Sequence, residues 1–404
     1  MKRNMRRLAM VLALAWTLAA QSEDAQLGQI RALLAPFRAN PRANLETRGA
    51  TPEFDRIKHS LRDWVESKIT ALKPNADVGP LERKLNNDLS KAGLLCEAGK
   101  GCPDQNPLGF LGEIELRWEW EYLVAQTGVG IQDCGLDESA YAYRRTGERW
   151  ERFWQDEQNE YAEKEYAPRA IDGVLFSPTP YEPGADKNQR LILTLGRHEW
   201  CTSNWRPVYY RIWQTSSRLK EPKLLLDENQ VAFLADPIQG SVSADDVLIE
   251  FSAQSIDAGV LTRREVRHYA LHHGRMERAD PLVLGPRDFA DEWITRPWAE
   301  SSHWTDPRAG PQLEKWHQRN TAKGGEFLYP TRHCPQRPDL WQVGIDFSNG
   351  DGRSDVAAEY FLIRWRPPYH FTMVDVSPYP WPDCSEEDRE ADEPRTLFLQ
   401  SWHN

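Results

Sequence analysis

The sequence lacks a complete catalytic or cofactor-binding motif. Ser241 in Gly240-Ser241-Val242 has no second glycine, so the Gly-x-Ser-x-Gly elbow of serine hydrolases is missing. Gly128-Val129-Gly130 falls short of a dinucleotide fingerprint, because Cys134-Gly135 stands where a helix should begin. No Cys-x-x-Cys pair or His/Cys cluster has metal-ligand spacing. The sequence therefore predicts no cofactor.

Basic residues are in the minority and form no block. Lys and Arg number 50 against 61 Asp and Glu, which gives a formal charge of −11. An acidic surface repels phosphate backbones, so we expect no nucleic-acid partner. The acidic stretch 386–393 is typical of a solvated face and lies in a predicted acidic C-terminal tail, residues 377–404.

Long apolar runs are absent after the first twenty residues. A basic stretch precedes an apolar run from Leu8 to Ala20, which has roughly 13 residues where a spanning helix needs about 20. Residues 1–20 are therefore predicted to be a secretory signal peptide, with a retained membrane anchor as the alternative. We expect a secreted or periplasmic protein that keeps no transmembrane anchor after cleavage.

Cysteine is scarce, and all six residues lie outside the predicted signal. They are Cys96, Cys102, Cys134, Cys201, Cys334 and Cys384. An even count in an exported chain predicts a disulfide framework whose connectivity the sequence leaves open. Cys96 and Cys102 close a short Gly-rich loop and form the favoured local pair. Cys134 and Cys201 occupy similar positions in adjacent repeats, which favours a second pair.

The hydrophobic period is helical over residues 21–95. Apolar residues recur at spacings of three and four from residue 27 to 37, from 54 to 72 and from 81 to 89. Thr51-Pro52 and Gly79-Pro80 are typical helix starts, and Pro74 ends the middle run. An N-terminal segment of three amphipathic helices is predicted.

Residues 108–376 have a strand-like pattern, interrupted by a helical insert at 286–323. Short β-branched and aromatic runs alternate with turn residues and group into four similar units that begin near residues 112, 173, 231 and 326. Repeated four-stranded antiparallel units are how β-propeller blades are built. We expect a mainly β chain with an N-terminal α-helical segment, β-propeller-like with four to five four-stranded units; a large β-sandwich is the alternative.

Polar loops follow the second strand of each unit. In a propeller these loops gather on one face, where a rigid scaffold presents functional side chains. The predicted ligand-binding residues are His198, Glu199, Trp200, Asn204, Trp205, Asp133 and Asp257. Two loop carboxylates, Glu199 and Asp257, could also serve glycoside hydrolysis, although the sequence does not give their separation.

Tryptophan is unusually frequent, with 17 residues. Its ring can stack on sugars, but it also supplies large buried area in strands. A structural role is favoured for the tryptophans within strand patterns, namely Trp118, Trp150, Trp154, Trp213 and Trp365. Trp200, Trp205 and Trp304 lie between strands and are the candidates for an exposed platform.

The segment Asn349-Gly350-Asp351-Gly352-Arg353-Ser354-Asp355 resembles the calcium loops of FG-GAP-type propeller repeats. The resemblance covers about ten residues and implies Asn349, Asp351 and Asp355 as calcium ligands. Phe347 stands where the first carboxylate belongs, so the favoured interpretation is an ordinary Asn-Gly-Asp-Gly turn.

Three functions agree with these features. The favoured one is a non-catalytic scaffold for a ligand or a protein, because no catalytic motif is complete. The alternatives are a secreted hydrolase acting on glycans through loop carboxylates, and a structural protein of the cell envelope. The expected partner is a protein or a glycan of the envelope.

Overall fold

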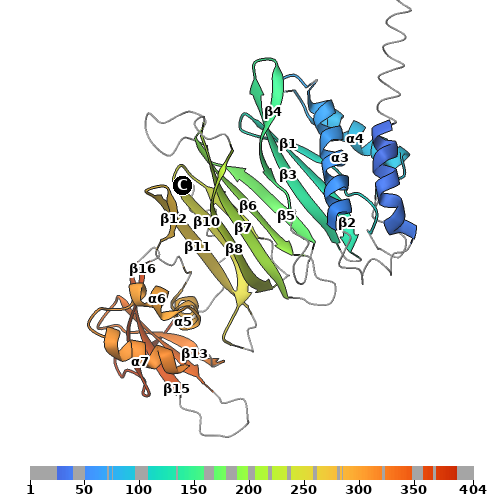
Figure 1. Cartoon of the computed structure of the whole chain (residues 1–404). Helices are drawn as coiled ribbons and strands as arrows, with labels where there is room; N and C mark the ends of the chain where they lie inside the picture. Colours follow the sequence, from blue (N-terminus) through green and yellow to red (C-terminus); the bar gives the residue numbers. More distant parts are fainter. Residues whose placement is uncertain are drawn as a thin grey trace, which may run out of the picture. The chain divides into compact units, whose positions relative to one another are not determined.

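The computed structural model gives the fold of most of the 404-residue chain (Figure 1). It describes residues 25–39, 51–70, 72–74, 76–95, 108–132, 135–158, 168–178, 189–198, 205–216, 221–233, 238–257, 262–279, 283, 285–320, 324–347, 358–366 and 370–388. The chain divides into two compact units. The first contains Met1–Val174, Gly196–Ser203 and Leu219–Pro222, and the second contains the remainder.

The N-terminal helices and the first sheet share one core. Residues 25–39, α3 (Thr51–Ile69) and α4 (Gly79–Lys91) are helical, and Pro80 lies in the first turn of α4, where no amide donor is needed. They lie against one face of the sheet (Figure 1). Its strands are β1 (Glu115–Glu119), β2 (Tyr122–Gln132), β3 (Gly135–Thr146) and β4 (Arg149–Asp156). Apolar residues of α3, such as Leu61 and Trp64, pack with Tyr141 and Tyr143 of β3.

Three more units follow, each a run of four strands that pair antiparallel. They are β5 (Arg169–Phe176), β6 (Arg190–His198), β7 (Trp205–Thr215) and β8 (Lys223–Phe233); β9 (Gln239–Val242), β10 (Asp246–Gln254), β11 (Thr262–His272) and β12 (Arg275–Arg278); and β13 (Glu326–His333), β14 (Leu340–Asp346), β15 (Ala358–Arg366) and β16 (His370–Ser377). The predicted class is confirmed: the chain is mainly β, with N-terminal helices and propeller-like four-stranded units.

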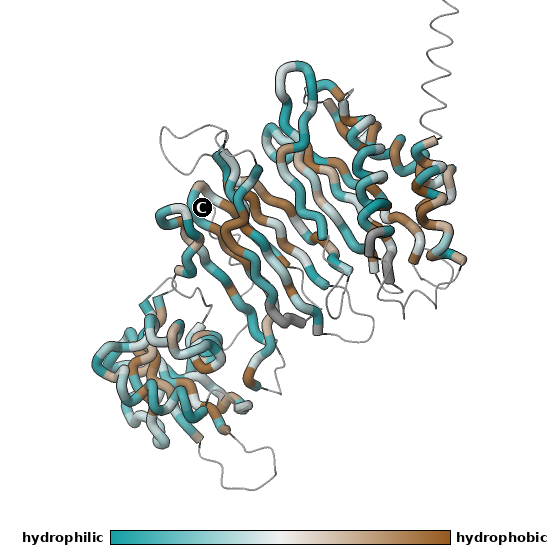
Figure 2. Tube along the Cα trace, viewed as in Figure 1, coloured by the Kyte–Doolittle hydropathy of each residue, from teal (hydrophilic) through white to brown (hydrophobic). Residues whose placement is uncertain are grey.

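The second and third units are joined into one eight-stranded sheet. The junction is a single pair, Ala253 of β10 opposite Ala232 of β8. Hydrophobic residues recur along the central strands (Figure 2). The hydroxyl oxygens of Tyr210 on β7 and Tyr269 on β11 are 2.8 Å apart, although a flat sheet would hold these strands about 14 Å apart. The two units therefore fold toward each other about the junction.

A glycine permits the closest approach between these two units. A Cβ atom placed on Gly240 of β9 would lie 2.5 Å from a methyl carbon of Leu195 and 2.7 Å from one of Leu193, both on β6. Such distances are shorter than carbon atoms tolerate, so a side chain at this position would separate β9 from β6.

The helical insert covers the fourth unit. It contains α5 (Pro286–Thr295), α6 (Trp298–Ser301), η2 (Ser302–Trp304) and α7 (Gly310–Asn320). Trp293 of α5 and Trp316 of α7 are buried against Phe361 of β15. Trp304, expected on an exposed platform, is instead 5% exposed, because it packs in this core and under the guanidinium of Arg278.

A disulfide closes the outer edge of the fourth unit. Cys334 directly follows β13 and is joined to Cys384, after which β17 (Glu386–Glu387) pairs with β13. Both half-cystines are buried. Among the residues described by the structure, no helix is both long and apolar enough to cross a membrane.

Candidate functional site

Most of the sequence-predicted site lies outside the described residues. This holds for Asp133, Glu199, Trp200 and Asn204. It also holds for Cys96, Cys102, Cys134 and Cys201, and for the calcium-loop residues Asn349, Asp351 and Asp355. Trp205 is the first residue of β7, and its side chain is not among those described. In the described part of the chain, no group of three or more His, Cys, Asp and Glu residues could hold a metal ion.

Two predicted residues are described, and they belong to different compact units. His198 is half-buried at the end of β6, within the first unit. Asp257 belongs to the second unit and is 2% exposed. Its Oδ2 accepts a hydrogen bond of 2.9 Å from the backbone nitrogen of Phe327. This carboxylate fixes the start of β13, and the ligand-binding role that we expected for Asp257 stays a prediction.

A continuous polar strip lies on the face of the first sheet that points away from the helices. Strand register places Glu115 opposite Gln126, and Glu138 opposite Gly128. Directly paired residues project to the same side of a sheet, so these side chains share a face. We call this set the Glu138 strip; its members are Glu115, Arg117, Glu119, Gln126 and Glu138 of the sheet, with Asp172 of β5 and Arg197 of β6.

Glu138 is held from two sides. Its Oε2 accepts 2.6 Å and 2.9 Å hydrogen bonds from the backbone nitrogen of Ile171 and from Nε2 of Gln126. Gln126 also donates to the carbonyl of Ile171 at 2.9 Å. The two side chains thus satisfy both backbone groups of Ile171 at the edge of β5, which is a structural role.

The protonation of Glu138 is nevertheless unusual. Burial raises its pKa to about 7, the two hydrogen bonds oppose this shift, and the carboxylates of Glu115 and Asp172 add to it. At neutral pH the group is therefore distributed between its acid and carboxylate forms. A carboxyl group in this state can donate or accept a proton, which is the requirement for acid–base chemistry.

Four further charges of the strip form two ion pairs at its border. Arg197 Nη2 lies 2.8 Å from Asp172 Oδ1, and Arg117 Nε lies 3.3 Å from Glu119 Oε1. Burial raises the pKa of both Asp172 and Glu119, and the neighbouring guanidinium opposes the shift in each case. The border of the strip thus combines carboxylates and guanidinium groups, which can bond a hydroxyl-rich ligand.

An exposed aromatic ring follows the strip directly. Trp120 occupies the tight turn between β1 and β2 with a φ of 58°, and it is 60% exposed. A positive φ is uncommon for a bulky residue and often marks a functional turn. Large exposed rings beside polar groups are suited to stacking on the apolar face of a sugar.

The polar contacts of Asp137, which points to the opposite side of β3 from Glu138, are structural. Lys58 of α3 donates to Asp137 Oδ2 and to the carbonyl of Gln158. Asp137 Oδ1 also accepts from the backbone nitrogen of Arg169, whose side chain pairs with Asp156 at 2.8 Å. These buried pairs fix α3 and the start of β5 to β3, so they leave the Glu138 strip as the more accessible polar group.

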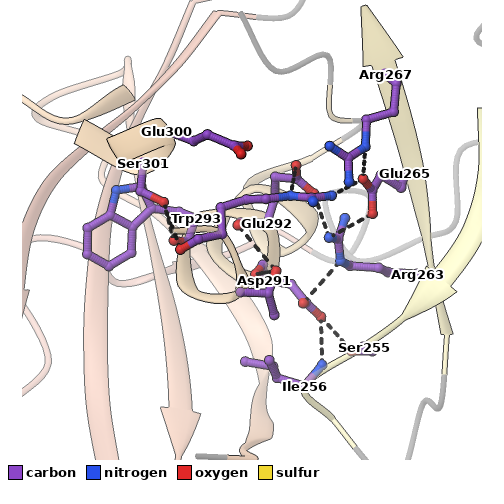
Figure 3. A network of polar contacts seen from close by, with 12 residues as sticks. Ser255, Ile256, Arg263, Glu265, Arg267, Asp291, Glu292, Trp293, Glu300 and Ser301 are labelled. Atoms are coloured by element: carbon purple, nitrogen blue, oxygen red, sulfur yellow. Dashed lines mark hydrogen bonds and ion pairs between the residues drawn. The ribbon is translucent and has the colours of Figure 1, made fainter. Parts of the chain in front are cut away.

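A second charged cluster lies in the second of the two compact units, between β11, β12 and the helical insert (Figure 3). Its cations are Arg263, Arg267, Arg278 and Arg296, and its anions are Glu265, Asp291, Glu292 and Glu300. The signs balance, and each carboxylate has a guanidinium partner. The balance favours a structural network that joins β11 to α5.

The Glu138 strip was not predicted from the sequence, because the predicted site residues were all in loops between strands. The available signal was Asp137-Glu138 within a run of otherwise buried residues on β3. Two adjacent acids in the middle of a core strand are costly unless both are bonded. That cost points to polar partners on both faces of the sheet.

Comparison with known proteins gives no family. No family model matches the chain, and no curated protein matches it in sequence. Similar solved structures include the GH93 alpha-L-arabinofuranosidase of Fusarium graminearum with arabinobiose, at 7% identity and a TM-score of 0.27, covering 67% of this chain and 68% of that one. Another is a Fusarium graminearum alpha-L-arabinofuranosidase with an iminosugar inhibitor, at 7% identity and a TM-score of 0.24, covering 63% of each chain. Similarities of this size establish no shared function.

Proposed function

We propose that this chain is an exported, non-catalytic scaffold that binds a hydroxyl-rich ligand, such as an envelope glycan, at the Glu138 strip. The observation that carries the proposal is the polar strip, whose member Glu119 directly precedes the exposed Trp120 in the chain. Carboxylates and guanidinium groups bond hydroxyls, while the ring covers the apolar face of a sugar. The basic and apolar character of residues 1–20 supports export.

Glycan binding can be tested with a matched pair of exposed aromatic residues. Trp120→Ala should abolish or weaken binding of the mature protein to a neutral oligosaccharide array by about tenfold, which corresponds to roughly 1.4 kcal/mol. Tyr379→Ala, at a position 75% exposed in the second unit, is the control and should leave binding unchanged. Equal binding by both variants and by the unaltered protein would show that Trp120 and the strip do not bind the glycan.

A hydrolase is the second candidate, and the pKa of Glu138 favours it. A carboxyl group with a pKa of about 7 near the arginine-paired carboxylate of Asp172 resembles the acid and base pair that glycoside hydrolysis requires. Release of nitrophenol from nitrophenyl glycosides should then be lost in Glu138→Gln and retained in Glu113→Gln, an exposed control. Absence of release by the unaltered protein across the panel would leave the binding scaffold as the proposal.

A further inference from the structure

A cavity of about 330 Å³ lies among the N-terminal helices of the first unit. Residues 25–39, α3 and α4 all contribute to its wall. Leu27, Trp64 and Ala92 supply the apolar part. Ligand pockets begin near 300 Å³, so this cavity suits a small organic molecule. It is formed by helices, and none of its lining residues belongs to the Glu138 strip.

The cavity is cationic within an acidic protein. Arg31, Lys84 and Lys91 line it, with Asp88 as its acidic residue. Positions 84, 88 and 91 are spaced by four and three residues, which places them on one face of α4. A net positive lining in a chain of formal charge −11 favours an anionic ligand.

Internal contacts occupy some of these charges and leave one available. Lys84 Nζ lies 2.6 Å from Asp88 Oδ2, which neutralises both. Arg31 donates through Nε and Nη2 to the carbonyl of Ala92, at 3.1 Å and 2.6 Å, which fixes its guanidinium at the rim. Lys91 has no ion-pair partner in the part of the chain that the structure describes.

Gly28 lines the cavity, and a Cβ atom at this position would meet nothing within 4 Å. A larger side chain at this position would therefore extend into the open space that a ligand would use.

We propose that this cavity binds a small monocarboxylic acid with an aromatic or branched apolar body. The carboxylate pairs with Lys91 and with the fixed guanidinium of Arg31. The apolar body lies against Leu27 and Ala92. None of the residues that contact the acid belongs to the Glu138 strip, so binding of the acid does not depend on glycan binding.

The test is calorimetric titration of the mature protein with 3-phenylpropionate. Saturable binding is expected, and phenylpropionamide, which lacks the charge, and inorganic phosphate, which lacks the apolar body, should not bind. Lys91→Gln should weaken the affinity by about tenfold, as the loss of one charged contact predicts. Lys73→Gln is the control, since Lys73 is exposed and does not line the cavity.

A cavity-filling variant keeps the proposal falsifiable if charge variants disturb the helices. Gly28→Leu should abolish binding while raising the melting temperature, because leucine favours a helix over glycine and fills open space. Gly310→Leu, at another position with nothing within 4 Å, should bind normally. Undiminished binding by Gly28→Leu, or no binding of 3-phenylpropionate at millimolar concentration, would overturn the assignment.

Discussion

Oε2 of Glu138 lies 2.6 Å from the backbone nitrogen of Ile171, and this hydrogen bond joins β3 of the first sheet to β5. Its acceptor, the carboxyl group of Glu138, can be protonated, and its donor belongs to β5, which is an edge strand. The stability of the first unit should therefore respond to pH through one side chain.

We predict that Glu138→Gln removes a pH dependence of stability. The pKa of Glu138 is about 7 in the folded protein against 4.5 for an ordinary glutamate, so the folded state binds more protons in this window. The free energy of unfolding should then fall as the pH rises from about 4.5 to 7, by at most about 1.4 kcal/mol per pH unit. Urea unfolding at a series of pH values measures this slope. Glutamine keeps the acceptor and carries no charge, so its slope should be flatter; identical slopes would contradict the assignment.

We predict a large loss of stability in Arg263→Met. The guanidinium of Arg263 pairs with Glu265, Asp291 and Glu292, all nearly fully buried. Removal of this cation leaves the buried Asp291 without a guanidinium and removes one of several guanidinium contacts from Glu265 and Glu292, and loss of a buried ion-pair partner costs about 3–5 kcal/mol. Arg275→Met, at an exposed position of β12, is the control and should change the free energy of unfolding by less than about 0.5 kcal/mol. Equal, small effects of both changes would show that the network in Figure 3 does not stabilise the second compact unit.

Loss of the fourth-unit disulfide should destabilise the protein without unfolding it. The bond joins Cys334 to Cys384 over 50 residues. Replacement of both by alanine should lower the free energy of unfolding by about 2–4 kcal/mol. Thermal unfolding under oxidising conditions measures the difference. Thiol titration of denatured, unreduced protein should also detect no free cysteine, and two or more free thiols would contradict the six-cysteine framework.

Export is tested by the mature N-terminus. Expression of the whole chain in a bacterial host, followed by fractionation, should place the protein outside the cytoplasm with a first residue close to Gln21. Replacement of Leu12 and Leu14 by Arg interrupts the apolar run and should leave uncleaved protein in the cytoplasm. Secretion of that variant would argue against a signal in residues 1–20.

Local patterns predicted the elements well because local physics determines them. The helices α3 and α4 begin at Thr51 and Gly79, each directly before the proline that predicted a helix start. The β3–β4 turn contains Gly147 with a φ of 63°, a conformation that glycine adopts readily. Repetition of strand and turn signals predicted the four-stranded units. The start of the third unit near residue 231 was wrong, because these residues belong to β8 and the unit begins with β9 at Gln239.

Relations between distant residues were not predictable from these patterns. Trp304 was expected on an exposed platform, but it is buried through its contacts with Arg278 of β12 and with the fourth-unit core. The raised pKa of Glu138 depends on burial beside Ile171, which is 33 residues away. The β8–β10 junction depends on one residue pair, which leaves no periodic signal.

The closure of the fourth unit has a mechanical consequence. After β16 the chain returns to the far edge of the sheet, where Cys384 is bonded to Cys334 and β17 pairs with β13. Tension applied beyond β17 would first separate this short strand from β13. The force would then act on the Cys334–Cys384 disulfide next to β13. Because the disulfide bears the force, β16 would stay paired with β15. In the oxidised protein this end of the sheet could therefore withstand pulling, while reduction would let the same force unravel the sheet from its end.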